Sequence, residues 1–312
     1  MKKERVLVVS VVLIVLFGLI MIYSSSYIWA EYKFQDAFHY VKNQAIFAII
    51  GFLLMHLMSK IDYHWYKEKS NMILGIAIIL LILVLIPGIG SVRNGARSWF
   101  GIGPLGIQPS EAAKLALIIF TSKYLENSNK FIKNIKTGVL PILAILFLIF
   151  GLIMLQPDFG TGMIIVVSIL AMMLVAGVNW KFFLCLGGIG VVGITALIIQ
   201  APYRLDRILS FLNPWQDPLG TGFQMIQSLY AIGPGGLLGM GFLNSRQKHF
   251  YLPEPQTDFI FSIIAEEFGF MGALIVVGLF VTILTSAIQI SLSCPDKFGK
   301  YLSFGMIFQI II

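Results

Sequence analysis

The sequence predicts an all-α protein that crosses a membrane many times, and its composition, its apolar runs and the placement of its basic residues lead to this fold class. Of its 312 residues, 58% are hydrophobic and 12% are charged, and its mean hydropathy is +0.88. A soluble domain of this size needs a polar exterior, so the composition excludes that class. Apolar runs of about 17 residues or more recur along the chain, and a helix of that length crosses roughly 30 Å of hydrocarbon.

Nine membrane spans are expected from these runs. They lie near residues 6–23, 44–58, 72–89, 112–125, 138–155, 162–178, 182–199 and 259–290, and a ninth begins near residue 298. The first run follows the basic sequence MKKER without a small-residue cleavage site, so we interpret it as a retained span rather than a signal peptide. No repeat or domain boundary is evident, and residues 1–312 are predicted to form a single transmembrane domain.

The basic residues predict the orientation of the chain. With the N-terminus in the cytoplasm, thirteen of the 22 Lys and Arg residues fall in cytoplasmic segments, eight fall in outside segments and one, Lys114, falls within a span. This bias follows the positive-inside rule. The net charge of +7 is therefore mainly a topology signal, and we expect no nucleic-acid partner.

Two of the outside loops are unusual, and long loops on a compact scaffold are commonly functional. The first covers residues 91–111, and the second covers roughly residues 200–257, between spans 7 and 8. Within the second, YRLDRILSFLNPW has apolar residues at helical spacing beside arginines, which predicts an interfacial helix. The segment GFQMIQSLYAIGPGG predicts a short helix that Gly-Pro-Gly-Gly ends.

Glu111 and Lys114 stand at the start of the fourth span, in IQPSEAAKLALIIF. Pro109 precedes the expected helix, Ser110 can cap it, and Glu111 favours its positive N-terminal end. The spacing i, i+3 puts Glu111 and Lys114 on one helix face. Either they form an ion pair that lines a polar cavity, or Lys114 is a snorkelling lysine in an ordinary capped helix.

A second polar group, Gln156 and Asp158, lies in LQPDFGTG at the junction of the fifth and sixth spans. Asp158 is suited to a tight turn with an Asx-type hydrogen bond. In the alternative interpretation, Gln156 points inward and this group shapes the same cavity.

Asp258 lies at the mouth of the 259–290 run, in YLPEPQTDFIFSIIAEEFGF. If Thr257 caps the helix, Asp258 falls in the first turn, where any acidic residue is favourable. The alternative is a carboxylate exposed to a polar pocket, with Arg246 and Lys248 shortly before it in the sequence.

Glu266, two turns into the same run, favours the pocket. Carboxylates at membrane depth are costly and seldom face lipid, so we expect this helix face to border a hydrated cavity. The sequence has no metal-ligand spacing, Walker loop or GxSxG motif, so no metal site and no cofactor are predicted, and a divalent cation requirement stays open.

Several of these stretches resemble the SEDS family (shape, elongation, division and sporulation), which includes FtsW, SpoVE and RodA. They are RNGARSWFGIGPLGIQPSEAAKL (93–115), QPDFGTG (156–162), APYRLDRILSFLNPWQDPLGTGFQMIQSLYAIGPGGLLGMG (201–241) and SRQKHFYLPEPQTDFIFSIIAEEFGF (245–270). YSSSYIWAEYKF (23–34) and PEPQTDFIF are more similar to the FtsW/SpoVE branch than to RodA.

The resemblance implies a SEDS-type bundle of ten spans, of which about nine begin here. The family's later Pro-Phe-x-Ser-Tyr-Gly-Gly-Ser-type motif is missing, and the chain ends inside its ninth span. We therefore expect C-terminal spans to be missing from this chain.

The resemblance also implies an enzyme, a peptidoglycan glycosyltransferase that polymerises lipid II into β-1,4 glycan strands. Asp258 would be the general base. Because the donor leaves as a lipid-linked pyrophosphate, which needs no proton, a single base is enough. Arg93, Arg97, Arg246 and Lys248 are candidates to hold the pyrophosphate.

Trp99 completes the predicted substrate site as a sugar-stacking wall, with interfacial anchoring as its alternative role. Two other functions stay open: a lipid II flippase, since intramembrane charges fit a transporter too, and a non-catalytic scaffold for a transpeptidase. The resemblance implies as partners a class B penicillin-binding transpeptidase and other division or sporulation membrane proteins. The expected location is the bacterial cytoplasmic membrane, with the active site outside, at the division septum or in sporulation wall synthesis.

Overall fold

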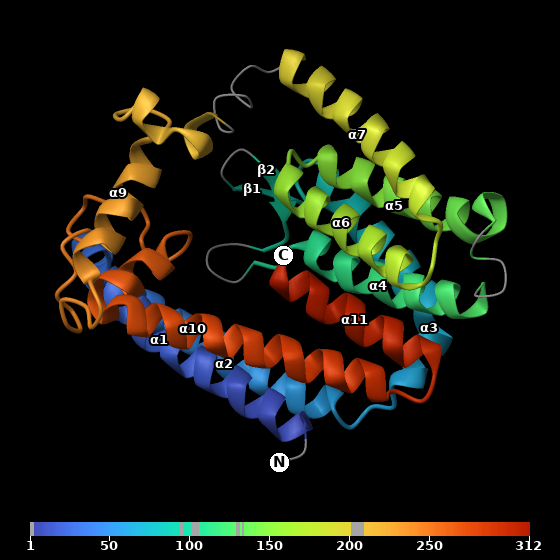
Figure 1. Cartoon of the computed structure of the whole chain (residues 1–312), viewed down its shortest axis with the longest axis horizontal. Helices are drawn as coiled ribbons and strands as arrows, with labels where there is room; N and C mark the ends of the chain where they lie inside the picture. The colour runs from blue at the N-terminus through green and yellow to red at the C-terminus, as the bar shows by residue number, and fades with distance from the viewer. Residues whose placement is uncertain (1–2, 94–95, 102–105, 129–131, 133, 201–208) are drawn as a thin grey trace. The chain divides into compact units, whose positions relative to one another are not determined.

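A computed structural model describes residues 3–93, 96–101, 106–128, 132, 134–200 and 209–312, and these residues are mostly helical (Figure 1). A helix stands at each of the nine expected spans, which confirms the polytopic all-α fold class. These helices are α1 (Lys3–Phe34), α2 (His39–Met58), α3 (Tyr63–Leu85), α4 (Pro109–Asn127), α5 (Leu140–Met154), α6 (Phe159–Val175), α7 (Trp180–Gln200), α10 (Ile260–Ser293) and α11 (Lys297–Ile311).

Five helical segments in the described part of the chain are long and apolar enough to cross a membrane. They are α1, α2, α3, Ile135–Met154 and α10, while Phe159–Val175 and Trp180–Val191 are shorter apolar helices. Large apolar side chains on these helices are exposed, as Leu53 on α2 and Ile79 on α3 illustrate. Such surface is stable only against hydrocarbon or a further helix, so the protein is a membrane protein.

The chain forms two compact units. The first contains residues 5–56 and 185–283, and the second contains residues 2–4, 57–184 and 284–312. The divisions fall inside α1, α2, α7 and α10 rather than at a linker. The two units are described separately below.

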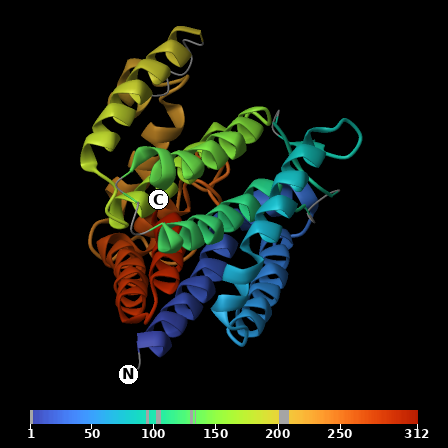
Figure 2. The same cartoon turned by 90° about the vertical axis from the view of Figure 1, so that its right-hand side faces the viewer.

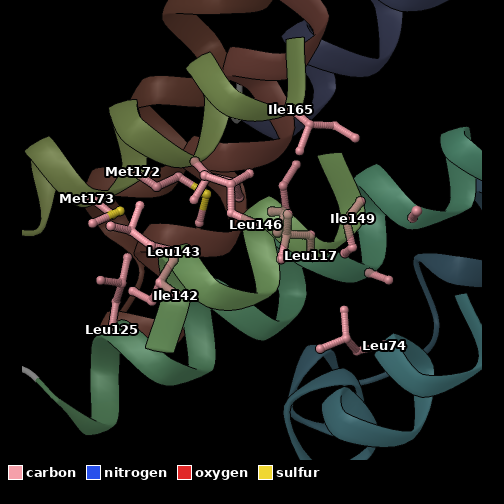
Figure 3. Close-up of a cluster of buried hydrophobic side chains, with 14 of the residues drawn as sticks. Leu74, Leu117, Leu125, Ile142, Leu143, Leu146, Ile149, Ile165, Met172 and Met173 are labelled. Carbon is pink, nitrogen blue, oxygen red and sulfur yellow. The ribbon is translucent and has the colours of Figure 1, made fainter. Parts of the chain in front are cut away.

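In the second unit, α4 is the central helix and contacts α3, α5, α6 and α11 (Figures 1 and 2). Its side chains at successive turns, including Leu117 and Leu125, are fully buried. Figure 3 shows them meeting Leu74 of α3, side chains of α5 such as Leu146, and side chains of α6 such as Met172.

The described parts of the predicted loops also form regular structure. Two strands, β1 (Ser91–Arg93) and β2 (Ala96–Trp99), pair antiparallel as a hairpin. The predicted short helix is confirmed as α9 (Phe223–Ile232), which passes into the 3₁₀ turn η3 (Gly233–Gly235). The described residues also form another 3₁₀ turn, η2 (Pro214–Gln216), and a short π-helix, η1 (Ile135–Val139). Of the predicted interfacial helix, residues 209–212 are helical and residues 214–215 belong to η2, while residues 203–208 lie outside the described residues.

In the first unit, α1 packs against α10, with Phe17 edge-on to Phe268 at 5.8 Å between ring centroids. Met21 of α1 belongs to the same apolar cluster as Ile263 and Ile264 of α10. Leu252, from the segment between α9 and α10, completes this cluster. The cluster therefore fixes α10 and the chain that precedes it onto α1.

Helix α10 is broken at Gly269, whose φ of 65° and ψ of −159° are not helical. Residues 236–241 fill the break. The amides of Phe270 and Met271 donate to the carbonyls of Gly236 and Leu237, at 2.8 and 3.1 Å. In return, the amides of Met240 and Gly241 donate to the carbonyls of Glu266 and Glu267, at 2.9 and 3.0 Å. These four hydrogen bonds pair backbone groups next to the break, as apolar surroundings require.

Candidate functional site

A cavity of about 420 Å³ in the first unit carries Asp258 on its wall. It is lined by Trp29, Gln224, Lys248, Phe250, Leu252, Pro253, Glu254, Pro255, Asp258 and Phe259. These residues come from α1, from the start of α9 and from the segment that leads into α10. Asp258 is exposed, so its carboxylate is available to a molecule in the cavity.

The capping alternative for Asp258 is wrong. Helix α10 begins at Ile260, after Asp258. The Thr257 hydroxyl donates to the carbonyl of Glu254 at 3.0 Å rather than capping α10. The two prolines and this turn hold the chain out of the helix until Ile260, which leaves Asp258 in a turn on the cavity wall.

Behind the cavity lies a buried ion pair between Lys248 and Glu267. The Lys248 Nζ is 2.7 Å from Glu267 Oε1, and both side chains are fully buried. The Ser24 hydroxyl of α1 lies 2.6 Å from each oxygen of the same carboxylate. The ammonium of Lys248 also donates to Ser24 at 3.4 Å and stands 5.1 Å from the ring centre of Tyr27.

Glu266, the carboxylate predicted to border a hydrated cavity, is also buried, at 1% exposure. It accepts from the Ser245 hydroxyl at 2.6 Å and from the Arg246 amide at 2.7 Å. The Ser245 amide in turn donates to Glu267 at 3.4 Å. The two adjacent glutamates therefore bind the start of the segment that leads to Asp258, because each accepts polar hydrogens that burial would otherwise leave unpaired.

The cations predicted near Asp258 differ in accessibility. Arg246 is exposed, with its backbone fixed by Glu266. Lys248 belongs to the cavity wall, but its ammonium faces Glu267 rather than the open space. Of these two predicted substrate-binding residues, Arg246 is the one whose charge is accessible.

The other predicted substrate residues lie on the hairpin of the second unit. Arg97 and Trp99 are on β2, and both are half-buried. The hairpin pairs Val92 with Arg97 and Ser91 with Trp99. Arg93 is the last residue of β1, and its side chain lies outside the described residues.

The predicted pairing of Glu111 with Lys114 is present in the second unit. Lys114 Nζ is 2.9 Å from Glu111 Oε1, and the two side chains are 10% and 56% exposed. The predicted cap is wrong, because α4 already begins at Pro109 with Gln108 at the N-cap position. Ser110 is inside the helix, and its buried hydroxyl has no hydrogen-bond partner.

Gln108 connects this helix end to Asp158. Its Nε2 donates to Asp158 Oδ2 at 2.9 Å, while the Thr161 amide donates to Asp158 Oδ1 at 3.1 Å. Asp158 therefore caps α6, which confirms the turn interpretation, and also ties α6 to α4. Gln156 does point inward, because its side chain is fully buried, with neither polar atom hydrogen-bonded.

Sequence reasoning missed three residues of the first unit. It gave no role to Glu267, to Ser24 or to Trp29, although Trp29 lines the cavity together with Asp258. A second carboxylate inside an apolar run was the signal for Glu267. The serine triplet of residues 24–26 in an otherwise apolar span was the signal for Ser24.

Known proteins resemble this chain over nearly its whole length. Stage V sporulation protein E of Bacillus subtilis is 50% identical over 311 residues, which cover 100% of this chain and 85% of that protein. A probable peptidoglycan glycosyltransferase FtsW of Trichlorobacter lovleyi is 38% identical, over 98% of this chain and 80% of that protein.

Solved structures give the same result. A chain in a peptidoglycan synthase complex that coordinates polymerization and crosslinking matches with a TM-score of 0.75 and 31% identity, over 97% of this chain and 82% of that one. The rod shape determining protein RodA of Thermus thermophilus matches with a TM-score of 0.68 and 27% identity, over 97% and 80%. The model of the FtsW/RodA/SpoVE family, described as cell cycle proteins, matches residues 4–312. This chain therefore belongs to the FtsW/RodA/SpoVE family.

Proposed function

We propose that this protein is a peptidoglycan glycosyltransferase that polymerises lipid II into β-1,4 glycan strands at the outer face of the cytoplasmic membrane. A relative that is 38% identical over 98% of this chain carries the name of this activity. The observation that carries the proposal is the exposed carboxylate of Asp258 on the wall of a cavity of about 420 Å³. Such a cavity lies within the size range of small-molecule sites.

The chemistry needs one base. The 4-hydroxyl of an acceptor GlcNAc attacks C1 of the donor MurNAc and gives its proton to Asp258 as the new C–O bond forms. The bond from C1 to the undecaprenyl pyrophosphate breaks on the opposite side, so the sugar inverts. The pyrophosphate takes the electron pair and needs no proton at neutral pH, in contrast to the leaving group of most glycoside hydrolases.

The leaving pyrophosphate gains negative charge as that bond breaks, and cations lower the barrier by stabilising it. Arg246 is exposed and close in sequence to Asp258, and Arg97 is half-buried on its hairpin. Arg93, Arg97 and Arg246 are the proposed pyrophosphate ligands, with Trp99 as a sugar-binding wall.

The experiment is polymerisation of purified lipid II by the protein in detergent or vesicles, with its transpeptidase partner present. Asp258→Asn keeps the size and hydrogen bonds of the side chain but removes the base, so polymer formation should fall by about 10²-fold or more. Normal glycan from folded Asp258→Asn protein would contradict the assignment. Wild-type protein that moves lipid II across vesicles without polymerising it would instead identify a flippase.

Asp36→Asn is the matched control, because Asp36 lies between α1 and α2 and is not among the residues that line the cavity. A hydrogen bond from Lys42, at 2.8 Å, holds the pKa of Asp36 below its ordinary value. Asp36 is therefore an ionised aspartate at neutral pH, and its change to asparagine should leave polymer formation unchanged.

The partner that we propose is a class B penicillin-binding transpeptidase. A similar chain occurs in a peptidoglycan synthase complex, and polymerisation followed by crosslinking requires both activities at one place. We further propose that the N-terminus is cytoplasmic, that the cavity with Asp258 opens outside, and that the protein acts at the division septum or in the sporulation wall.

A further inference from the structure

Three polar groups from distant parts of the chain meet around Lys248, which lines the cavity together with Asp258, and the mechanism above does not use them. They are Ser24 on α1, Lys248 in the segment before α10, and Glu267 on α10. Lys248 donates to Ser24 and to Glu267, and Ser24 donates to Glu267, so the three form a closed triangle. The side chains of Lys248 and Glu267 are fully buried, and Ser24 is 0% exposed.

This arrangement fits a structural role for Lys248 better than phosphate binding. A phosphate ligand needs an accessible positive charge, whereas the charge of Lys248 is neutralised by Glu267 at 2.7 Å. Two charges without access to water persist only when each has a close partner and satisfied hydrogen bonds. Ser24 supplies one of those hydrogen bonds to each member of the pair.

The triangle lies where it can control the position of Asp258. From Arg246 to Asp258 the chain makes mainly local turns, such as His249 to Arg246 and Thr257 to Glu254. Its polar attachments to the helices are at its beginning, through the two glutamates of α10. Leu252, packed in the apolar cluster, is a further attachment. A shift of Lys248 would therefore be transmitted to Asp258 through a short, proline-stiffened segment.

We propose that Ser24, Lys248 and Glu267 form a positioning latch, which fixes the segment that carries Asp258 onto α1 and α10 at the geometry that catalysis requires. The three are positioning residues and do not touch the substrate. This inference rests on the proposed function, since the base that the latch positions is the proposed Asp258. It assigns Lys248 to the latch instead of to the pyrophosphate site.

Ser24→Ala tests the latch without leaving a charge unpaired, and the chain offers a matched control. Ser25 is equally buried, at 1% exposure, but its hydroxyl donates to the Ile22 carbonyl of its own helix. Ser24→Ala should lower kcat for lipid II polymerisation by about 10- to 100-fold, because small misplacements of a catalytic group have effects of that size. KM should stay the same, since no substrate contact is lost.

Ser25→Ala should retain wild-type kcat, and Ser24→Thr, which keeps the hydroxyl, should restore most of it. Equal kcat for Ser24→Ala and Ser25→Ala would overturn the proposal. A rise in KM at unchanged kcat would also overturn it, because it would identify a substrate contact.

A double-mutant cycle separates the latch from phosphate binding. Lys248→Met leaves the Glu267 carboxylate unpaired, and Glu267→Gln leaves the ammonium unpaired, so each change alone should lower activity. The double variant has no unpaired charge and keeps a group that bonds Ser24, so it should regain activity relative to Lys248→Met. If Glu267→Gln is fully active and Lys248→Met is inactive with either residue at position 267, Lys248 binds phosphate and the latch is wrong.

Hydrogen exchange keeps the latch testable if the proposed function fails. If wild-type protein does not polymerise lipid II, the enzyme assignment fails, but the latch still predicts a local effect. Amide exchange in residues 245–258 should be faster in Ser24→Ala than in wild type and unchanged in Ser25→Ala. Unchanged exchange in Ser24→Ala would overturn the latch, whatever the activity of the wild type.

Discussion

At the residue scale, two Lys–Glu ion pairs differ in solvent exposure and should therefore differ in how substitution changes stability. Lys248 and Glu267 are both fully buried, whereas in the second unit Lys114 is 10% exposed and Glu111 is 56% exposed. The more exposed carboxylate keeps much of its hydration when its partner is removed, but a buried ammonium does not. The two members of the Glu111–Lys114 pair should therefore respond unequally to substitution.

Glu111→Gln should destabilise the protein by about 1–3 kcal/mol, because it leaves the buried Lys114 ammonium without its carboxylate. Lys114→Met should cost less than about 1 kcal/mol, because the remaining carboxylate is half in solvent and the apolar side chain suits the site. The measurement is the thermal unfolding of both variants in detergent. Equal melting temperatures for the two variants would show that the pair is evenly solvated.

At the element scale, the break in α10 determines which residues bind the segment that carries Asp258. The backbone of residues 236–241 replaces two helical hydrogen bonds at Gly269. A side chain at Gly269 would collide with the backbone of Gly239 and Leu237, and its φ of +65° is strained for any other residue. Glu266 and Glu267 lie just before the break. Their carbonyls accept hydrogen bonds from residues 240–241, and their carboxylates bind residues 245–248.

Gly269→Ala should destabilise the first unit by more than about 3 kcal/mol, from the strained backbone together with the collision. Gly278→Ala is the control in the same helix, because a methyl group there has no atom within 4 Å. It should be neutral or stabilising by about 0.5–1 kcal/mol, since alanine favours helix. The measurements are the yield and the melting temperature of the two variants. Equal values would mean that the break is not required for stability.

At the scale of the whole molecule, exposed apolar surface occurs both on the spanning helices and on the segment between α7 and α10. On the helices, this surface suits hydrocarbon. In the segment, the exposed apolar side chains include Phe211 at 71%, Trp215 at 53% and Leu219 at 90% exposure. Trp215 also stacks edge-on against Tyr230 of α9, at 5.9 Å. Exposed aromatic and apolar side chains outside the spanning helices are suited to a protein partner.

We propose that the transpeptidase partner favours one arrangement of this segment. Trp215→Ala should then lower transpeptidase-stimulated polymerisation more than basal polymerisation. Trp180→Ala is the control, since Trp180 at the start of α7 is similarly exposed, at 61%, but lies on the side predicted to be cytoplasmic. Polymer yield with and without the partner is the measurement. Equal wild-type yields in both conditions would mean that the segment is not a regulatory surface.

The sequence by itself determined where the nine helices of the expected spans lie, and it singled out Asp258 as the candidate base. The apolar length of a span and a carboxylate at its end can both be recognised from residues that are close in sequence. The same holds for α9 and for the Glu111–Lys114 pair, whose partners are close in sequence. The helix ends were less predictable, because the side chains of Ser110 and Thr257 suit a cap that their backbone positions do not allow.

Only the tertiary structure decided which polar groups meet around Lys248. Ser24 and Glu267 are 243 residues apart, and no periodicity connects them. Glu266 and Glu267 are neighbours with the same chemistry, yet one binds a backbone amide and the other a lysine. The packing of α1 against α10, together with residues 236–241 at the Gly269 break, determines which groups these two carboxylates contact. That packing is a long-range property, so it exists only once the chain has folded.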